Sequence, residues 1–148
     1  MNLLRSIRSF IGRDTVTIGV RAAIIDQHDR VLLVRHTYTQ GWYFPGGGVE
    51  CGETMDEALA RELREEVNVE LVGPAVLFGA YLNITVSPRD HVMFYLAREF
   101  SVSGPKRPNL EIAAAQWFPI ADPPPGTTTA TRRRLREITG HKPVVPKW

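Results

Sequence analysis

Residues 46–69, GGGVECGETMDEALARELREEVNV, decide how this chain is interpreted. The first part is rich in glycine, which predicts a loop with unusual backbone angles rather than a regular element. The second part predicts a helix from about Met55 to Val67. Thr54 and Glu57 have the spacing of a capping box at its start. Asn68 stands where the helix should end, since asparagine tolerates the left-handed cap conformation.

Glutamates gather on one face of this helix. On a helical wheel drawn at about 100° per residue, the apolar residues of this helix form one arc. Glu62 and Glu66 fall inside this arc, and Glu65 lies at its edge. Like charges at this spacing repel one another, and their removal from water adds a desolvation penalty. A divalent cation would relieve the repulsion, because hard ions such as magnesium prefer oxygen ligands. The alternative is a set of solvated glutamates paired with Arg61 and Arg64.

The spacing of Gly47, Glu53 and the run Arg61-Glu62-Leu63-Arg64-Glu65-Glu66 resembles the signature of the Nudix hydrolases. The resemblance extends from about residue 17 through residues 117–118 and the proline-rich loop that follows them. One departure is Asn68, where the family usually has glycine. It implies an α/β fold, an α/β/α sandwich with a mixed β-sheet and flanking helices. The length and composition separately predict one domain over residues 1–148, and the spacing of apolar residues in residues 1–14 predicts a helical N-terminal extension.

The resemblance implies that Glu62, Glu65 and Glu66 bind magnesium or manganese, and that the carbonyl of Gly46 adds a ligand. Such an ion offsets the charge of a diphosphate and activates water. The expected reaction is therefore attack by water at phosphorus, which cleaves a pyrophosphate bond. The expected substrate is a nucleoside triphosphate or a nucleoside diphosphate linked to another moiety.

Two kinds of role remain for residues of the motif and its surroundings. Gly47 and Arg61 are expected to be structural, with Arg61 orienting the glutamates. A carboxylate near the metal should take the proton of the attacking water. The candidates for catalysis are Glu66, Glu65, Glu53 and Glu111. By the resemblance Glu53 also anchors the loop, and for Glu111 an ordinary loop position is an equal alternative.

Arginines in otherwise apolar strands are candidates for binding phosphate. Arg21 interrupts an apolar strand and Arg35 ends another, although either could instead be an edge charge with its stem packed on the sheet. Phe44 is a candidate for substrate binding, because aromatic faces stack on nucleobases. Trp42, Tyr43 and Trp117 share that property, and packing is the more common use of such rings.

Outside the motif, β-branched and aromatic residues predict strands at residues 17–26 and 31–34, joined as a hairpin. Further strands are expected within residues 75–82, 92–100 and 115–118. A proline-rich loop at residues 122–126 separates the last strand from a short helix at residues 131–139, which Gly140 ends.

The composition limits the partners. A formal net charge of +2 over 148 residues gives no global field for DNA binding. RNA is a less favoured partner, because the cluster from Arg132 to Arg136 is better explained as a solvated helix face. No apolar run reaches the roughly 18 residues of a membrane span. The single cysteine, Cys51, excludes an intramolecular disulfide and is typical of a cytoplasmic protein.

Other functions are less well supported by the residues. A catalytically silent nucleotide sensor with this fold would usually lack a motif glutamate, and all of them are present here. An isomerase would need a catalytic cysteine in a separate loop, whereas Cys51 lies inside the motif. An RNA pyrophosphohydrolase and a homodimer both remain open.

Overall fold

The computed structural model describes residues 15–148, so the extension predicted for residues 1–14 lies outside the described residues. Its centre is a mixed four-stranded sheet with the order β3 (Gly46–Gly48), β1 (Thr17–Ile24), β6 (Asp90–Ala97) and β5 (Val76–Leu82). β1 and β6 run parallel, and the two outer pairs are antiparallel.

The remaining strands form two smaller sheets. β2 (Arg30–His36) pairs with β8 (Ile112–Pro119), and β4 (Val69–Leu71) pairs with β7 (Phe100–Val102). The hairpin predicted from β1 to β2 is wrong beyond its turn, where Ile25 and Val31 form a single bridge. Both edges of β1 are already occupied by β3 and β6, so β2 pairs with β8 instead.

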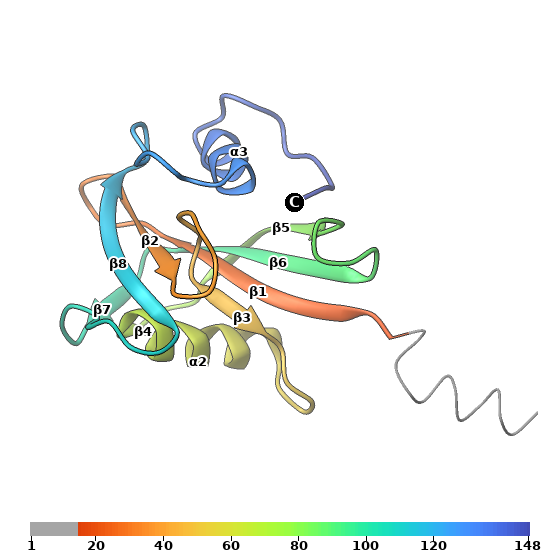
Figure 1. Ribbon diagram of the computed structural model, residues 1–148, viewed down its shortest axis with the longest axis horizontal. Helices are drawn as coiled ribbons and strands as arrows, with labels where there is room; N and C mark the ends of the chain where they lie inside the picture. The colour runs from red at the N-terminus through yellow and green to blue at the C-terminus, as the bar shows by residue number, and fades with distance from the viewer. Residues whose placement is uncertain (1–14) are drawn as a thin grey trace, which may run out of the picture.

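Helices cover both faces of the central sheet (Figure 1). α2 (Met55–Val67) has the predicted bounds, and its capping box between Thr54 and Glu57 is formed. Asn68 ends it in the left-handed conformation at φ 57°. Leu59 and Leu63 of α2 are buried in one core, whereas Leu135 of α3 (Thr129–Ile138) is buried in the core on the other side.

Two other expectations are corrected. The glycines of β3 were expected in a loop, but they pair with β1, with Gly46 opposite Arg21. A partner strand supplies hydrogen bonds that override weak strand propensity. The strand expected at residues 92–100 is two strands, because β6 ends at Ala97 and Phe100 begins β7. Within residues 15–148 no helix is long and apolar enough to cross a membrane.

Candidate active site

The glycines of β3 bring the motif loop against both β1 and α2. The Gly46 amide donates a hydrogen bond to Glu66 Oε2 at 2.9 Å, which links β3 to the helix. A Cβ atom on Gly46, at φ 145°, would overlap the carbonyl of Val20. A Cβ atom on Gly47 would overlap the carboxylate of Glu62. Glycine is therefore required at Gly46, where the obstacle is backbone, whereas a side chain at Gly47 would displace the carboxylate of Glu62.

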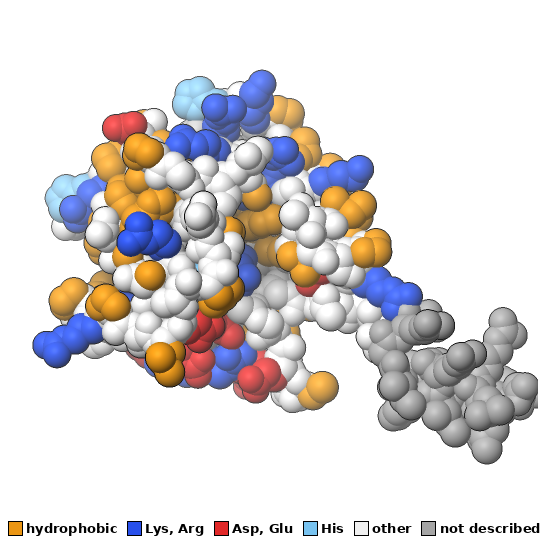
Figure 2. Space-filling view, in the orientation of Figure 1, with side chains coloured by type: hydrophobic (Ala, Val, Ile, Leu, Met, Phe, Trp, Pro, Cys, Tyr) orange, Lys and Arg blue, Asp and Glu red, His pale blue; other side chains and the backbone are white. Residues whose placement is uncertain are grey.

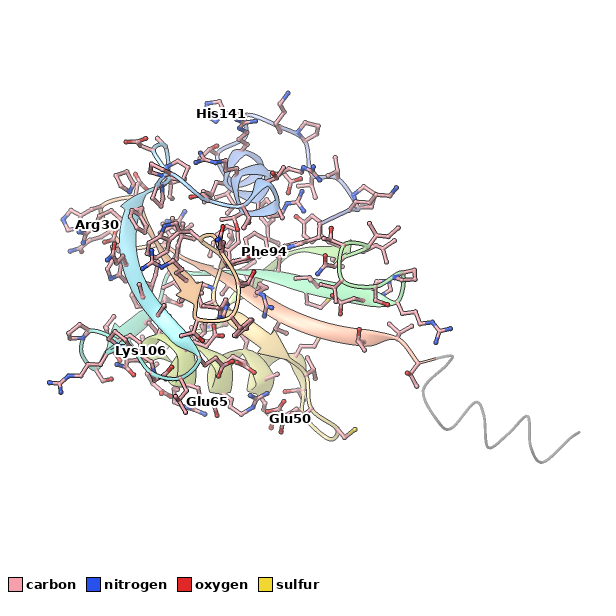
Figure 3. All side chains as sticks on the ribbon, in the orientation of Figure 1. Arg30, Glu50, Glu65, Phe94, Lys106 and His141 are labelled. Carbon is pink, nitrogen blue, oxygen red and sulfur yellow. The ribbon has the colours of Figure 1, made fainter. Side chains whose placement is uncertain are left out.

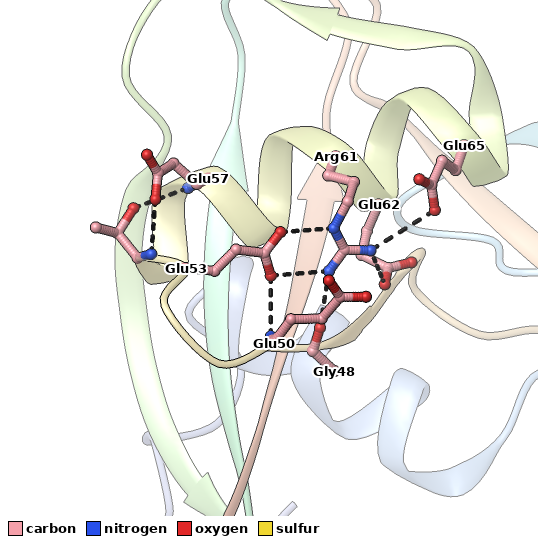
Figure 4. A network of polar contacts seen from close by, with 8 residues as sticks. Gly48, Glu50, Glu53, Glu57, Arg61, Glu62 and Glu65 are labelled. Carbon is pink, nitrogen blue, oxygen red and sulfur yellow. Dashed lines mark hydrogen bonds and ion pairs between the residues drawn. The ribbon is translucent and has the colours of Figure 1, made fainter.

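Arg61 is the centre of a polar network that joins α2 to the motif loop (Figure 4). Its Nε and Nη2 atoms contact the two carboxylate oxygens of Glu53 at 2.6 and 2.9 Å. Nη1 donates to Glu62 Oε1 at 2.8 Å and lies 3.6 Å from Glu65 Oε2. Nη2 also donates to the carbonyl of Gly48. This position is the one expected of a residue that orients the glutamates.

Glu53 is held on both carboxylate oxygens. In addition to Arg61, the amide of Glu50 donates to Glu53 Oε2 at 2.9 Å. Hydrogen bonding to Arg61, and then to the Glu50 amide, lowers the pKa of Glu53 to about 2. A carboxylate with such a low pKa is a weak proton acceptor near neutral pH. The geometry therefore favours loop anchoring over proton transfer for this residue.

Glu66 is a carboxylate in the interior, with 5% of its surface exposed. Burial raises its pKa to about 7, although the Gly46 amide and the guanidinium of Arg21 oppose that shift. The carboxylates of Glu62 and Glu111 also contribute to the rise. Residues from α2, β1 and the segment before β8 thus converge electrostatically on one buried group.

The residues at this site suit a divalent cation chemically. The pKa of the Glu66 carboxylate is raised first by burial and then by the negative charges of Glu62 and Glu111, and a bound cation would offset both effects. In this conformation no three His, Cys, Asp or Glu side chains within residues 15–148 are arranged to hold a metal. Glu62 and Glu65 both turn toward Arg61. Metal binding would therefore require these two side chains to change rotamer.

The predicted phosphate ligands lie in different places. Arg21 lies close enough to Glu66 to lower its pKa, and it lines a groove of about 410 Å³ that also contains Asn83 and Trp148. Arg35 lines a separate groove beside residues 36–42, with its guanidinium 5.4 Å from the centre of the Trp42 ring. Of these two arginines, only Arg21 thus acts on an acidic residue of α2.

Phe44 belongs mainly to the core. Its ring is 1% exposed and lies 4.7 Å from the ring of Phe94, although the residue also borders the Arg21 groove. Phe44 therefore fits the alternative that its ring packs in the core, because a ring covered by Phe94 is not open to a nucleobase. Trp117 stacks on Phe100 with ring centres 5.8 Å apart.

His36 and Tyr38 were not among the predicted site residues, although charges of those residues act on them. Their rings stack at 5.0 Å, and Tyr38 is 70% exposed. Partial burial raises the pKa of Tyr38, and the carboxylates of Glu111 and Glu66 raise it further. Burial and the nearby Arg21 lower the pKa of His36. The available sequence signal was a histidine at the end of a strand, followed by a tyrosine in the polar loop after it.

Comparison with known proteins places this geometry in a family. The NUDIX domain family model matches residues 15–140. The chain is 29% identical over 104 residues to an ADP-ribose pyrophosphatase of Methanocaldococcus jannaschii, covering 68% of this chain and 61% of that protein. An RNA pyrophosphohydrolase of Halorhodospira halophila is 48% identical over 59 residues, or 40% of this chain and 33% of that protein. The chain thus spans less than two thirds of the length of either relative.

A solved structure supports the same assignment. The crystal structure of a MutT NUDIX hydrolase from Burkholderia pseudomallei superposes with a TM-score of 0.71 at 29% identity. The superposition covers 84% of this chain and 99% of that chain. The predicted α/β architecture, a mixed sheet with flanking helices, is confirmed.

Proposed function

The chain belongs to the NUDIX domain family, and from this premise we propose that it is a metal-dependent pyrophosphohydrolase of nucleotides. The proposed substrate is a nucleoside triphosphate or a nucleoside diphosphate linked to another moiety. The observation that carries the proposal is the buried carboxylate of Glu66, on which the charges of Arg21, Glu62 and Glu111 all act. This arrangement combines oxygen donors for a cation with a fixed positive charge for a diphosphate.

Glu62, Glu65, Glu66 and the carbonyl of Gly46 would hold magnesium or manganese. When bound, the ion supplies positive charge that offsets the diphosphate and polarises its bonds to phosphorus. Arg61 keeps Glu62 and Glu65 on the same side of α2. Gly46 holds one oxygen of Glu66 in place, so the other oxygen remains for a ligand.

Glu111 is our choice for the proton acceptor. Glu53 is committed to Arg61 on both oxygens, and Glu66 is buried and bonded to Gly46. Within residues 15–148, Glu111 has an exposed side chain that no hydrogen bond or ion pair restrains, yet its charge acts on Glu66 and Tyr38. A carboxylate with this freedom can accept the proton of water that attacks phosphorus.

Arg21 is our choice for the diphosphate ligand. Nη1 of its guanidinium donates a hydrogen bond to the carbonyl of Val20 at 3.1 Å, and the other N–H groups remain to donate to phosphate oxygens. The groove it lines provides space beside the reacting phosphates for the rest of the nucleotide. The exposed thiol of Cys51 suits the reducing cytoplasm, which we propose as its location.

The test is product analysis with purified protein. Nucleoside triphosphates, ADP-ribose and dinucleoside polyphosphates are each incubated with magnesium, manganese or a chelator. We expect metal-dependent cleavage of one class. Binding of a nucleotide without cleavage of any of them would instead favour a sensor.

Variants assign the roles. Glu65→Gln should lower turnover strongly with an unchanged circular dichroism spectrum, and near-normal turnover would refute its place in the metal set. Glu111→Gln should lower kcat by about 100-fold or more. Glu70→Gln changes an exposed carboxylate on β4 and serves as the control, with wild-type activity expected.

A further inference from the structure

The Arg21 groove has a volume of about 410 Å³, and Arg21, Asn83 and Trp148 all line it. Its walls come from β1, from the turn between β5 and β6, and from the start of α3. In Figure 2 the surface is hollowed below α3, whereas acidic side chains gather over α2. Concavities of this size hold small organic ligands, and a few polar groups on their walls set the specificity.

One wall of the Arg21 groove rests on an aromatic cluster that is packed in place. Phe94 of β6, labelled in Figure 3, lies between the sheet and α3. Its ring centre is 4.7 Å from that of Phe44 and 5.4 Å from that of Trp148. The amide of Trp148 donates to the carbonyl of Leu82 at 3.0 Å, which fixes its backbone at the end of β5. Trp148 itself is half-buried and lines the groove, and an aromatic wall of this kind accepts the ring of a nucleobase.

Asn83, which directly follows β5, brings a side-chain amide to the same groove. Its Nδ2 atom donates to Oδ2 of Asp90 at 3.0 Å. The other carboxylate oxygen of Asp90 accepts a hydrogen bond from the hydroxyl of Thr17 at 2.7 Å. The backbone amide of Asn83 also donates to the carbonyl of Asp90 at 2.8 Å. Both the backbone and the side chain of Asn83 are therefore held by the start of β6.

The contact with Asp90 decides which way the amide of Asn83 is turned. A carboxylate only accepts hydrogen bonds, so it selects the NH₂ group of Asn83 and directs the carbonyl oxygen Oδ1 away from itself. Within residues 15–148 no hydrogen bond has this Oδ1 atom as its acceptor, and Asn83 is half-buried. An acceptor left without a donor in such a position favours a ligand that supplies an N–H group.

This acceptor distinguishes between the edges of nucleobases. An exocyclic amino group donates hydrogen bonds, whereas a keto oxygen only accepts them. Oδ1 of Asn83 therefore pairs with an amino group and repels a keto oxygen. The amide of Asn83 cannot turn over to offer its NH₂ group to a keto oxygen without losing its hydrogen bond to Asp90.

We propose that Asn83 is a specificity-determining residue of the Arg21 groove, where its side-chain carbonyl accepts a hydrogen bond from the exocyclic amino group of a nucleobase. The base lies against Trp148, and its 5′-phosphates extend to Arg21. Binding of the phosphates by Arg21 rests on the proposed function, whereas selection of an amino-bearing base does not. Adenine or guanine nucleotides are thus favoured over those of hypoxanthine, which has no exocyclic amino group.

Binding is measured by isothermal titration calorimetry with AMP, GMP and IMP in the presence of a chelator. These monophosphates contain no pyrophosphate bond, so their binding does not depend on hydrolysis. The variant is Asn83→Leu, which keeps the size of the side chain and removes the acceptor. Asn83→Ala is a second variant that keeps the backbone hydrogen bonds of the turn. The matched control is Thr85→Val, which removes a hydroxyl group from the same turn and the same groove.

We expect wild type to bind AMP or GMP at least about tenfold more tightly than IMP, because IMP leaves Oδ1 of Asn83 unpaired in the complex. The preferred base identifies which amino group reaches Asn83. Both Asn83 variants should bind IMP at least as tightly as wild type does, which shows that the groove is intact, and should bind all three nucleotides within about twofold of one another. Thr85→Val should keep the wild-type preference.

Equal affinity of wild type for AMP, GMP and IMP would overturn the proposal, as would a preference that both Asn83 variants retain. In hydrolysis with magnesium, kcat/KM for ATP or GTP should exceed that for ITP in wild type but not in Asn83→Leu. Hydrolysis of all three triphosphates with equal kcat/KM would overturn the role of Asn83 and leave the proposed function standing. Discrimination in binding without hydrolysis of any nucleotide would refute the proposed function and leave the role of Asn83 standing.

Discussion

Glu66→Gln should stabilise the metal-free protein while removing its activity. The ordinary pKa of a glutamate is 4.5, and burial raises that of Glu66 to about 7. Between these values the folded state retains a proton that the unfolded state has lost, so stability falls as pH rises. A pKa difference of one unit corresponds to about 1.4 kcal/mol, so the ionised carboxylate lowers the stability of the folded state by about 3 kcal/mol at pH 8. Glutamine has nearly the same shape, can still accept from Gly46 and carries no charge.

The assay is urea unfolding followed by tryptophan fluorescence, with a chelator present, at pH values from 5 to 8. We expect the variant to be more stable than wild type by up to about 3 kcal/mol at pH 8, with the difference shrinking to about 1 kcal/mol at pH 5. Adding magnesium should stabilise wild type more than the variant, because a ligand of the folded state shifts the equilibrium.

The control is Glu70→Gln, which changes an exposed carboxylate that lies 3.2 Å from Arg64. An exposed ion pair contributes between about 0 and 1 kcal/mol, so its effect should be small and depend little on pH. The reasoning is refuted if Glu66→Gln is less stable than wild type at pH 8. It is equally refuted if the difference between the two proteins does not grow with pH.

Substitutions at three further positions examine the motif. Arg61→Lys loses the two-point contact with Glu53, so kcat should fall by about 10- to 100-fold with circular dichroism unchanged; an unchanged kcat would exclude an orienting role. Gly46→Ala places a methyl group on the Val20 carbonyl, so the free energy of unfolding should fall by more than about 3 kcal/mol in urea. A smaller loss would mean that β3 can shift. Asn68→Ala should lower the free energy of unfolding by about 1 kcal/mol, because alanine is strained at φ 57°, whereas Asn68→Gly should leave it unchanged or raise it. Equal losses of stability for the two variants in thermal unfolding would contradict the role of Asn68 as the cap.

The sequence by itself determined α2 and the chemistry carried on its surface. The capping box at Thr54, the stop at Asn68 and the acidic face all arise from residues within a few positions of one another. Hydrogen bonds and side-chain pairs at spacings of three and four residues are local, so periodicity predicts them. The partial burial of Glu66 also followed from this periodicity.

Only the tertiary structure decided which distant segments meet at that helix. Gly46 became part of a strand because β1 supplied partners for its backbone, and Glu111 and Tyr38 approached Glu66 because β2 pairs with β8 rather than with β1. Within the cluster from Arg132 to Arg136, Arg134 is buried against Glu137, whereas Arg136 is exposed beside the segment that follows α3. Such contacts depend on pairing and packing between remote residues, which the local sequence pattern does not encode.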